Sequence, residues 1–219
     1  LGIPIDLSFL DAVDREATAR RFGLDSGKPI ILIMGGGGGF GNLREIVQNL
    51  DTLTYPCQLV VATGTNRQLL TWLQSQRFRH RLLPLGYTDA VPALMSLATL
   101  LVSKPGGLTT SEALAKHLPL VIVNPIPGQE AYNARFLLSQ GGAVQAGSPD
   151  TVRQTVRDLL DNPGQLQALR TRSAALSRPA AALDVARLLA ALSDRSHGVP
   201  AAIPDASPAP SPHEADLVR

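Results

Sequence analysis

The chain has 219 residues, 44% of them hydrophobic and 17% charged, which suits one α/β domain with a tail and excludes wholesale disorder. Its 20 basic and 18 acidic residues leave a formal net charge of +2, too small to indicate a nucleic-acid-binding protein. The single cysteine, Cys57, excludes a disulfide scaffold and a cysteine-based zinc site. No apolar stretch approaches the ~18–20 residues that a membrane-spanning helix needs.

The first 28 residues predict a linker and a short helix. Residues 1–8 are typical of a linker, and residues 11–22 of a short charged helix. The chain begins with Leu1 and not with Met, so we expect it to be part of a longer protein.

From Pro29 to Gly147, short apolar runs alternate with longer helical patterns. The run at 30–34 has no polar alternation, which is typical of a strand covered on both faces. Pro84 places its strand near an edge or a strand end, because proline cannot donate to a strand ladder. The alternation predicts an α/β fold, a Rossmann-like parallel sheet with helices on both faces. Strands are expected at 30–34, 58–62, 82–85, 99–103, 120–124 and 143–145, and helices at 43–50, 66–76, 89–97, 110–116 and 130–139.

After Gly147 the pattern is helical. One helix is expected to begin at 148–150, Asn162-Pro163 divides it from a second, and 180–192 could form a third. Residues 196–219 carry five of the 17 prolines among alanine and serine, without apolar periodicity. This composition predicts a disordered Pro/Ala-rich tail.

Two glycine-rich segments follow predicted strands, and ligands of open parallel sheets bind at these carboxyl ends. In the first, at 35–42, backbone amides and a helix N-terminus could bind a phosphate, the alternative being a flexible turn. The acidic residue of a dinucleotide site and the lysine and hydroxyl of a P-loop are missing. In the second, at 103–113, Thr109-x-x-Glu112 has the spacing of a capping box. Alternatively, its amides bind phosphate while Glu112 accepts hydrogen bonds from a ribose diol; Lys104 could simply be an exposed strand-end cation.

A third strand end presents polar side chains on a stiffened loop. Two prolines at 125 and 127 precede Gln129, Glu130 and Asn133 at the entry of a helix. These are either ordinary surface residues or partners for a polyhydroxylated ligand, whose hydroxyls each need a directed hydrogen bond.

Two stretches closely resemble the nucleotide-sugar half of diacylglycerol glycosyltransferases. They are K-P-G-G-L-T-T-S-E-A-L-A at 104–115 and L-P-L-V-I-V-N-P-I-P-G-Q-E-A-Y-N-A at 118–134. These are the monogalactosyldiacylglycerol synthases and the processive diacylglycerol glucosyltransferases, with the enzyme that adds N-acetylglucosamine to make lipid II as a more distant relative. Residues 1–6 resemble the segment that joins the two halves of such enzymes. The resemblance extends over about residues 1–192.

The resemblance implies that residues 29–195 are the nucleotide-sugar-binding C-terminal domain of a GT-B glycosyltransferase, with residues 1–28 as the interdomain linker and short helix. Its donor would be UDP-galactose or UDP-glucose, a substrate rather than a cofactor, and its acceptor a lipid such as diacylglycerol, bound through the missing N-terminal half. No cofactor, no metal and no nucleic acid are expected. The enzyme would work in the cytoplasm or as a peripheral protein on the cytoplasmic face of the membrane.

The motif positions also imply roles for individual residues. Relatives often carry an arginine near the phosphate where this chain has Asp6, which Lys104 or another cation would have to compensate. The diphosphate and the transfer point would lie against Gly36, Gly37, Gly38 and Gly39, and uracil against the backbone of Tyr87 and Thr88. Phosphate would lie against Gly106, Gly107, Leu108 and Thr109. Glu112 would bind the ribose hydroxyls, and Gln129 and Glu130 would bind the sugar.

The catalytic base remains unassigned, and the resemblance places it in the N-terminal half. We therefore expect this chain to bind donor without turning it over. The alternatives are half of a UDP-sugar epimerase, a non-catalytic nucleotide-binding module and, least favoured, a dehydrogenase. A basic cluster at 77–81 either touches anionic lipid headgroups or is a solvated helix end.

Overall fold

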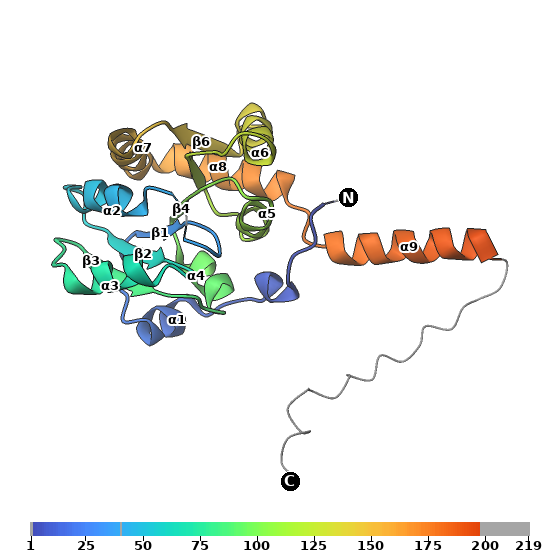
Figure 1. The fold of residues 1–219 in the computed structure, drawn as a ribbon, viewed down its shortest axis with the longest axis horizontal. Helices are drawn as coiled ribbons and strands as arrows, with labels where there is room; N and C mark the ends of the chain where they lie inside the picture. The colour runs from blue at the N-terminus through green and yellow to red at the C-terminus, as the bar shows by residue number, and fades with distance from the viewer. Residues whose placement is uncertain (1, 40, 198–219) are drawn as a thin grey trace, which may run out of the picture. The chain divides into compact units, whose positions relative to one another are not determined.

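The computed structural model describes residues 2–39 and 41–197 (Figure 1). The described residues form one parallel sheet in the order β3-β2-β1-β4-β5-β6. The order reverses between β1 and β4, and ligands of such sheets bind in the crevice at this point. The strands are β1 (Ile30–Met34), β2 (Gln58–Ala62), β3 (Arg81–Leu85), β4 (Leu100–Ser103), β5 (Leu120–Val123) and β6 (Ala143–Ala146).

Helices cover both faces of the sheet, as expected (Figure 1). Alternate residues of β1 face opposite layers, because Ile31 and Ile33 pack into one core and Ile30, Leu32 and Met34 into the other. The helices are α1 (Arg15–Arg21), α2 (Leu43–Asp51), α3 (Arg67–Ser75), α4 (Val91–Leu97), α5 (Gly107–Ala115), α6 (Gln129–Ser139), α7 (Pro149–Asp161), α8 (Pro163–Leu176) and α9 (Ala181–His197), with a 3₁₀ turn, η1, at Leu7–Leu10. The first core takes side chains from α2, α3 and α7, and the second from α1, α4, α5 and α6.

Local chemistry explains several element boundaries. Asn66 caps α3 as predicted, since its side chain accepts the N–H of Leu69. Asn162 ends α7 and caps α8 through the N–H of Gln165, which confirms the predicted division. Pro84 lies in β3, at an edge of the sheet, also as predicted.

Several element boundaries differ from the sequence-based prediction, most clearly before β1 and at the start of α5. The turn η1 falls partly in the predicted linker, and α1 begins at Arg15 because the side chain of Asp14 caps it. Helix α5 begins at Gly107, three residues before the expected start. Gly107, Leu108 and Thr109 therefore form its first turn, so their amides point out of a helix N-terminus.

The chain divides into two compact units, Leu1–Ala182 and Leu183–Arg219. The first contains the sheet, and the described part of the second is the remainder of α9, which continues past the predicted residue 192 to His197. Most of the predicted tail, residues 198–219, lies outside the described residues.

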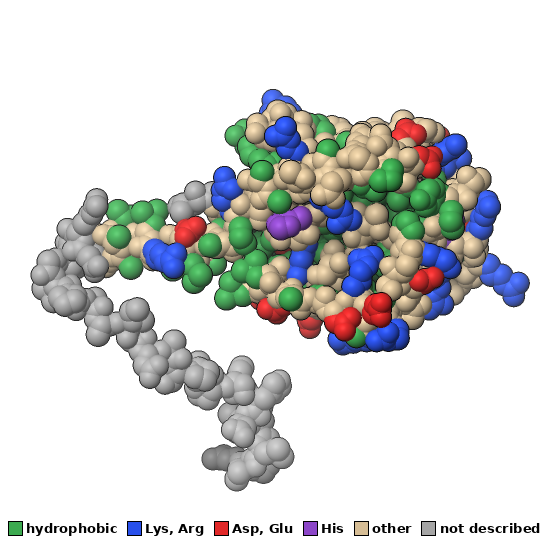
Figure 2. Space-filling view, turned by 180° about the vertical axis from the view of Figure 1, so that it is seen from behind, with side chains coloured by type: hydrophobic (Ala, Val, Ile, Leu, Met, Phe, Trp, Pro, Cys, Tyr) green, Lys and Arg blue, Asp and Glu red, His purple; other side chains and the backbone are tan. Residues whose placement is uncertain are grey.

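Basic, acidic and apolar side chains are interspersed on the face of the first unit that Figure 2 shows. This pattern agrees with the small net charge of +2. Within residues 2–39 and 41–197, none of the helices has both the length and the apolar character required to cross a bilayer.

Candidate functional site

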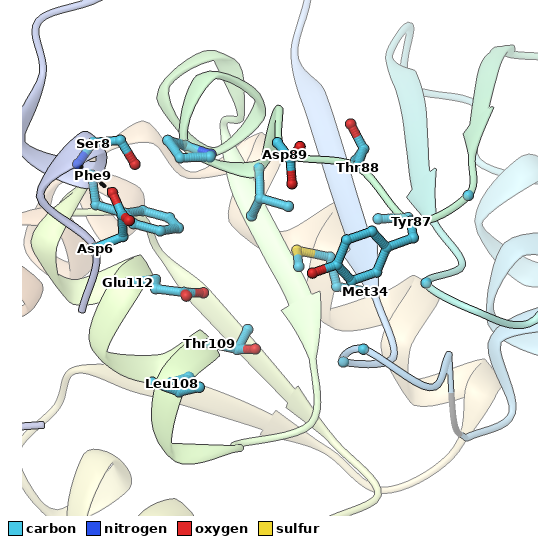
Figure 3. Close-up of a pocket in the computed structure, with 17 residues that line it drawn as sticks. Asp6, Ser8, Phe9, Met34, Tyr87, Thr88, Asp89, Leu108, Thr109 and Glu112 are labelled. Carbon is cyan, nitrogen blue, oxygen red and sulfur yellow. Dashed lines mark hydrogen bonds between the residues drawn. The ribbon is translucent and has the colours of Figure 1, made fainter. Parts of the chain in front are cut away.

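A cavity of about 540 Å³ lies at the carboxyl ends of β1, β2 and β3, with α5 as a further wall (Figure 3). It is therefore beside the point where the strand order reverses. Segments far apart in the sequence contribute to it, namely Asp6, Ser8 and Phe9 from η1 and its N-cap, Met34, Gly36 and Gly37 after β1, Ala62 and Gly64 after β2, Gly86, Tyr87, Thr88, Asp89, Val91 and Pro92 from β3 to α4, and Leu108, Thr109 and Glu112 on α5.

The glycine segment after β1 is a hydrogen-bonded turn. The N–H of Gly39 donates to the carbonyl of Gly36 at 3.0 Å, and both residues have positive φ. The carbonyl of Gly37 accepts the N–H of Thr65 at 2.9 Å, which ties the turn to the loop after β2. At both Gly36 and Gly37 a Cβ atom would have no neighbour within 4 Å, so backbone faces open space in the cavity.

Helix α5 corrects the capping-box interpretation. Its N-cap is Gly106, which makes no side-chain cap hydrogen bond, and Thr109 is already inside the first turn. Glu112, one turn later, has no side-chain hydrogen bond to any residue that the structure describes. Figure 3 shows its carboxylate pointing into the cavity beside Thr109. The carboxylate that the capping box would have consumed is therefore available to a ligand.

Burial determines the electrostatics of Glu112. The side chain is half-buried, and this desolvation raises the pKa of its carboxyl above the ordinary value. A ligand whose hydroxyl groups donate to the carboxylate would replace the lost water.

Tyr87 and Thr88 follow β3 and line the opposite wall (Figure 3). Tyr87 is 75% exposed, whereas the Thr88 hydroxyl accepts the N–H of Ala90 at 3.1 Å. Tyr87 and Thr88 therefore share this cavity with the glycine turn and α5, and their contact with uracil stays a prediction.

Asp6 places a carboxylate at the cavity, at the position where the resemblance implies an arginine near the phosphate. It accepts the N–H of Ser8 at 2.8 Å, and hydrogen bonding to Ser8 lowers the pKa of Asp6. The Asp6-x-Ser8 spacing is typical of such a local side-chain turn. Among the described lining residues, Asp6, Asp89 and Glu112 are acidic and none is lysine or arginine. Backbone amides and helix N-termini would thus have to attract an anion here.

Lys104, Gln129 and Glu130 form a second group beside the first turn of α5. Lys104 and Glu130 form an ion pair of 3.1 Å between Nζ and Oε1, with side chains 13% and 19% exposed. Lys104 is therefore not the exposed strand-end cation of the alternative interpretation. A Cβ atom on Gly107 would lie 3.5 Å from Nε2 of Gln129, so the Gln129 amide lies against the start of α5. Gly38, Gly39, Lys104, Gly106, Gly107, Gln129 and Glu130 do not line the 540 Å³ cavity.

The basic cluster at 77–81 contains a structural histidine. Nε2 of His80 lies 2.9 Å from the carbonyl oxygen of Leu53, and the carboxylate of Asp51 accepts the N–H groups of Arg79 and His80. Elsewhere too, the described residues include no group of three or more His, Cys, Asp or Glu side chains that could hold a metal ion.

Comparison with known proteins shows the family and the fold of the chain. Residues 30–185 match the family described as "Glycosyltransferase family 28 C-terminal domain". The processive diacylglycerol beta-glucosyltransferase of Bacillus pumilus is 32% identical over 172 residues, 77% of this chain and 45% of that protein. This chain thus spans about half the length of the curated relatives that it matches.

Two solved structures share the fold. MurG of Acinetobacter baumannii superposes with a TM-score of 0.65 at 22% identity, covering 82% of this chain and 54% of that one. Alr3699/HepE of Anabaena, solved with UDP-glucose, gives a TM-score of 0.66 at 12% identity, covering 90% and 56%. The architecture is that of GT-B glycosyltransferases, as the sequence predicted. On the strength of the match over residues 30–185, the chain belongs to the glycosyltransferase family 28 C-terminal domain family.

Proposed function

We propose that the chain is the donor-binding domain of a hexosyltransferase that moves a sugar from a UDP-sugar to diacylglycerol. One observation carries the proposal: a half-buried carboxylate without a hydrogen-bond partner among the described residues, that of Glu112, shares a cavity with the open backbone of Gly36 and Gly37. The cavity volume of about 540 Å³ suits a ligand of nucleotide size.

In this proposal the donor lies across the carboxyl edge of the sheet. The diphosphate accepts hydrogen bonds from the glycine turn at 36–39 and from the first turn of α5, where the positive end of the helix dipole attracts it. Glu112 accepts from the two ribose hydroxyls, and the backbone of Tyr87 and Thr88 pairs with uracil. The hexose extends toward Gln129, whose side-chain amide lies near Gly107.

The proposed reaction is displacement at the anomeric carbon with UDP as the leaving group. Negative charge builds on the leaving diphosphate, and fixed N–H groups at the glycine turn and at α5 stabilise it without having to reorganise. A general base must also take the proton of the acceptor hydroxyl. We assign that base to the other half of the relatives' length, so this chain alone binds donor without transferring the sugar.

The name of the Bacillus pumilus relative and the UDP-glucose in the Anabaena structure favour glucose over galactose. A diacylglycerol acceptor resides in a bilayer, so we propose that the enzyme meets it as a peripheral protein at the cytoplasmic face, where UDP-sugars are made. Arginines of the cluster at 77–81 would then contact anionic headgroups.

The test is a thermal-shift panel with UDP, UDP-glucose, UDP-galactose, ADP-glucose and NAD, because a ligand that binds the folded state raises Tm. We expect the uridine nucleotides to raise Tm and the other two to leave it unchanged. Glu112→Gln should reduce the shift, whereas the matched control Glu16→Gln, at an exposed glutamate of α1, should not. The proposal fails if no uridine nucleotide stabilises the chain.

A further inference from the structure

A partly buried ion pair joins the loop after β4 to the first turn of α6, which ends the loop after β5. Nζ of Lys104 lies 3.1 Å from Oε1 of Glu130, 26 residues away, and the two side chains are 13% and 19% exposed. Charges that are largely removed from water depend on their partners, so loss of Lys104 leaves the carboxylate of Glu130 without its counter-charge. The pair therefore fixes the distance between the two loops.

Further hydrogen bonds strengthen the same junction. Oε2 of Glu130 accepts the N–H of Ile126 at 3.0 Å, within the loop after β5. Nδ2 of Asn133, one turn along α6, donates to the carbonyl of Pro105 at 3.0 Å, across the junction. Both carboxylate oxygens of Glu130 thus already have partners.

The loop held by these bonds has a strained backbone. Asn124 has a φ of +43°, which side chains rarely adopt, and Gly128 has a φ of +99°. Such conformations persist where surrounding contacts over-determine them, and they are frequent at binding sites. The bonds of Glu130 to Lys104 and Ile126 are contacts of this kind.

The loop that these bonds hold ends at Gln129, whose side-chain amide lies near the start of α5. Gln129 is the first residue of α6, and its Nε2 would lie 3.5 Å from a Cβ atom on Gly107. The next residues of α5, Leu108 and Thr109, line the donor cavity. Any displacement of the loop after β5 would therefore move the Gln129 amide relative to that cavity.

We propose that Lys104 and Glu130 are positioning residues, which hold Gln129 at the sugar end of the donor site and do not themselves contact the donor. This inference rests on the proposed function. It predicts that the pair affects affinity for the sugar part of the donor and leaves affinity for the nucleotide part nearly unchanged.

The test is a double-mutant cycle measured by calorimetry with UDP and with UDP-glucose. Lys104→Met and Glu130→Gln should each lower UDP-glucose affinity by about tenfold, with UDP affinity changing by less than about twofold, and the double variant should lose no more than either single variant. Gln129→Ala should reproduce the same pattern. The control Lys28→Met, which breaks an exposed ion pair with Asp25 before β1, should bind both ligands as the wild type does.

Other outcomes would overturn the inference. Normal UDP-glucose binding by Lys104→Met, together with a loss in Glu130→Gln, would make Glu130 a direct sugar ligand. An equal loss of UDP affinity in Lys104→Met would make Lys104 a phosphate ligand. Multiplying losses in the double variant would show that the two residues act independently.

A ligand-free measurement separates this inference from the proposed function. Amide hydrogen exchange at Ile126 should accelerate in Lys104→Met, because the partner of Glu130 has gone. Unchanged exchange would refute the positioning role, whatever the chain binds. Faster exchange in a protein whose wild type binds neither UDP nor UDP-glucose would instead refute the donor site, and the role of the pair in it.

Discussion

A Cβ atom on Gly64 would lie 2.1 Å from the carbonyl oxygen of Gly37, so the loops after β1 and β2 touch backbone to backbone. Gly64 also has a positive φ of 56°, which side chains rarely adopt. The loop after β2 therefore packs against the glycine turn, and Gly36, Gly37 and Gly64 all line the cavity.

This relationship predicts that one alanine substitution lowers the stability of the fold and another lowers only the affinity for UDP. Gly64→Ala should destabilise the fold by about 2 kcal/mol or more, because the methyl group meets backbone and the φ is strained. Gly37→Ala places its methyl group in open cavity space, so it should leave Tm unchanged and lower UDP affinity by roughly tenfold. Thermal melts and calorimetry check both variants. Wild-type UDP affinity in Gly37→Ala would show that this backbone does not face the nucleotide.

Because Glu112 is half-buried, we expect that removing its charge stabilises the protein in a pH-dependent way. Its pKa is raised by burial, so the folded state holds the proton more tightly than the unfolded chain does. The contribution of Glu112 to the free energy of unfolding is then most favourable below the unfolded-state pKa and is lost as the pH rises through the folded-state pKa. Glu112→Gln should therefore raise Tm at pH 7 by ~2 °C and leave Tm at pH 4 unchanged.

The same substitution should weaken UDP binding, which is the trade-off expected where a binding group is retained at a cost in stability. Glu16→Gln is the control, since Glu16 lies exposed on α1 and is paired with Arg20 at 3.7 Å. A lower Tm for Glu112→Gln at pH 7 would mean that the carboxylate has a stabilising partner.

Removing the charge of Asp6 should raise the affinity for UDP. Its carboxylate faces the cavity and repels a diphosphate, whereas an asparagine could still accept the N–H of Ser8. Asp6→Asn should raise UDP affinity by roughly threefold at low salt, and the gain should shrink at high salt because ions screen the repulsion. Calorimetry at two salt concentrations checks this.

Asp14→Asn is the matched control, since Asp14 caps α1 through the N–H of Ala17 and does not line the cavity. An affinity gain of the same size in Asp14→Asn would attribute the effect to net charge and not to the site.

The strands could be predicted because both faces of the sheet are covered, which leaves β1, β2, β4 and β5 as plain apolar runs. The start of α5 was misplaced because Gly106 and Gly107 resemble a loop, and a glycine N-cap has no side chain to mark it. The turn η1 is too short to show a period. The pairing of Lys104 with Glu130 depends on how far two loops extend beyond neighbouring strands, which the order of elements along the chain does not determine.

We expect the thiol of Cys57 to be unreactive until the protein unfolds. The side chain is 4% exposed, and burial, followed by the nearby charge of Asp51, raises the pKa of the thiol to about 11. At pH 8 only ~0.1% would be thiolate, the form that attacks disulfide reagents. Reaction with Ellman's reagent should therefore be slow in the native protein and complete in denaturant. Asp51→Asn should accelerate the native reaction, because it removes the charge that disfavours the thiolate. A native rate at pH 8 equal to that of the unfolded chain would contradict the burial of this thiol.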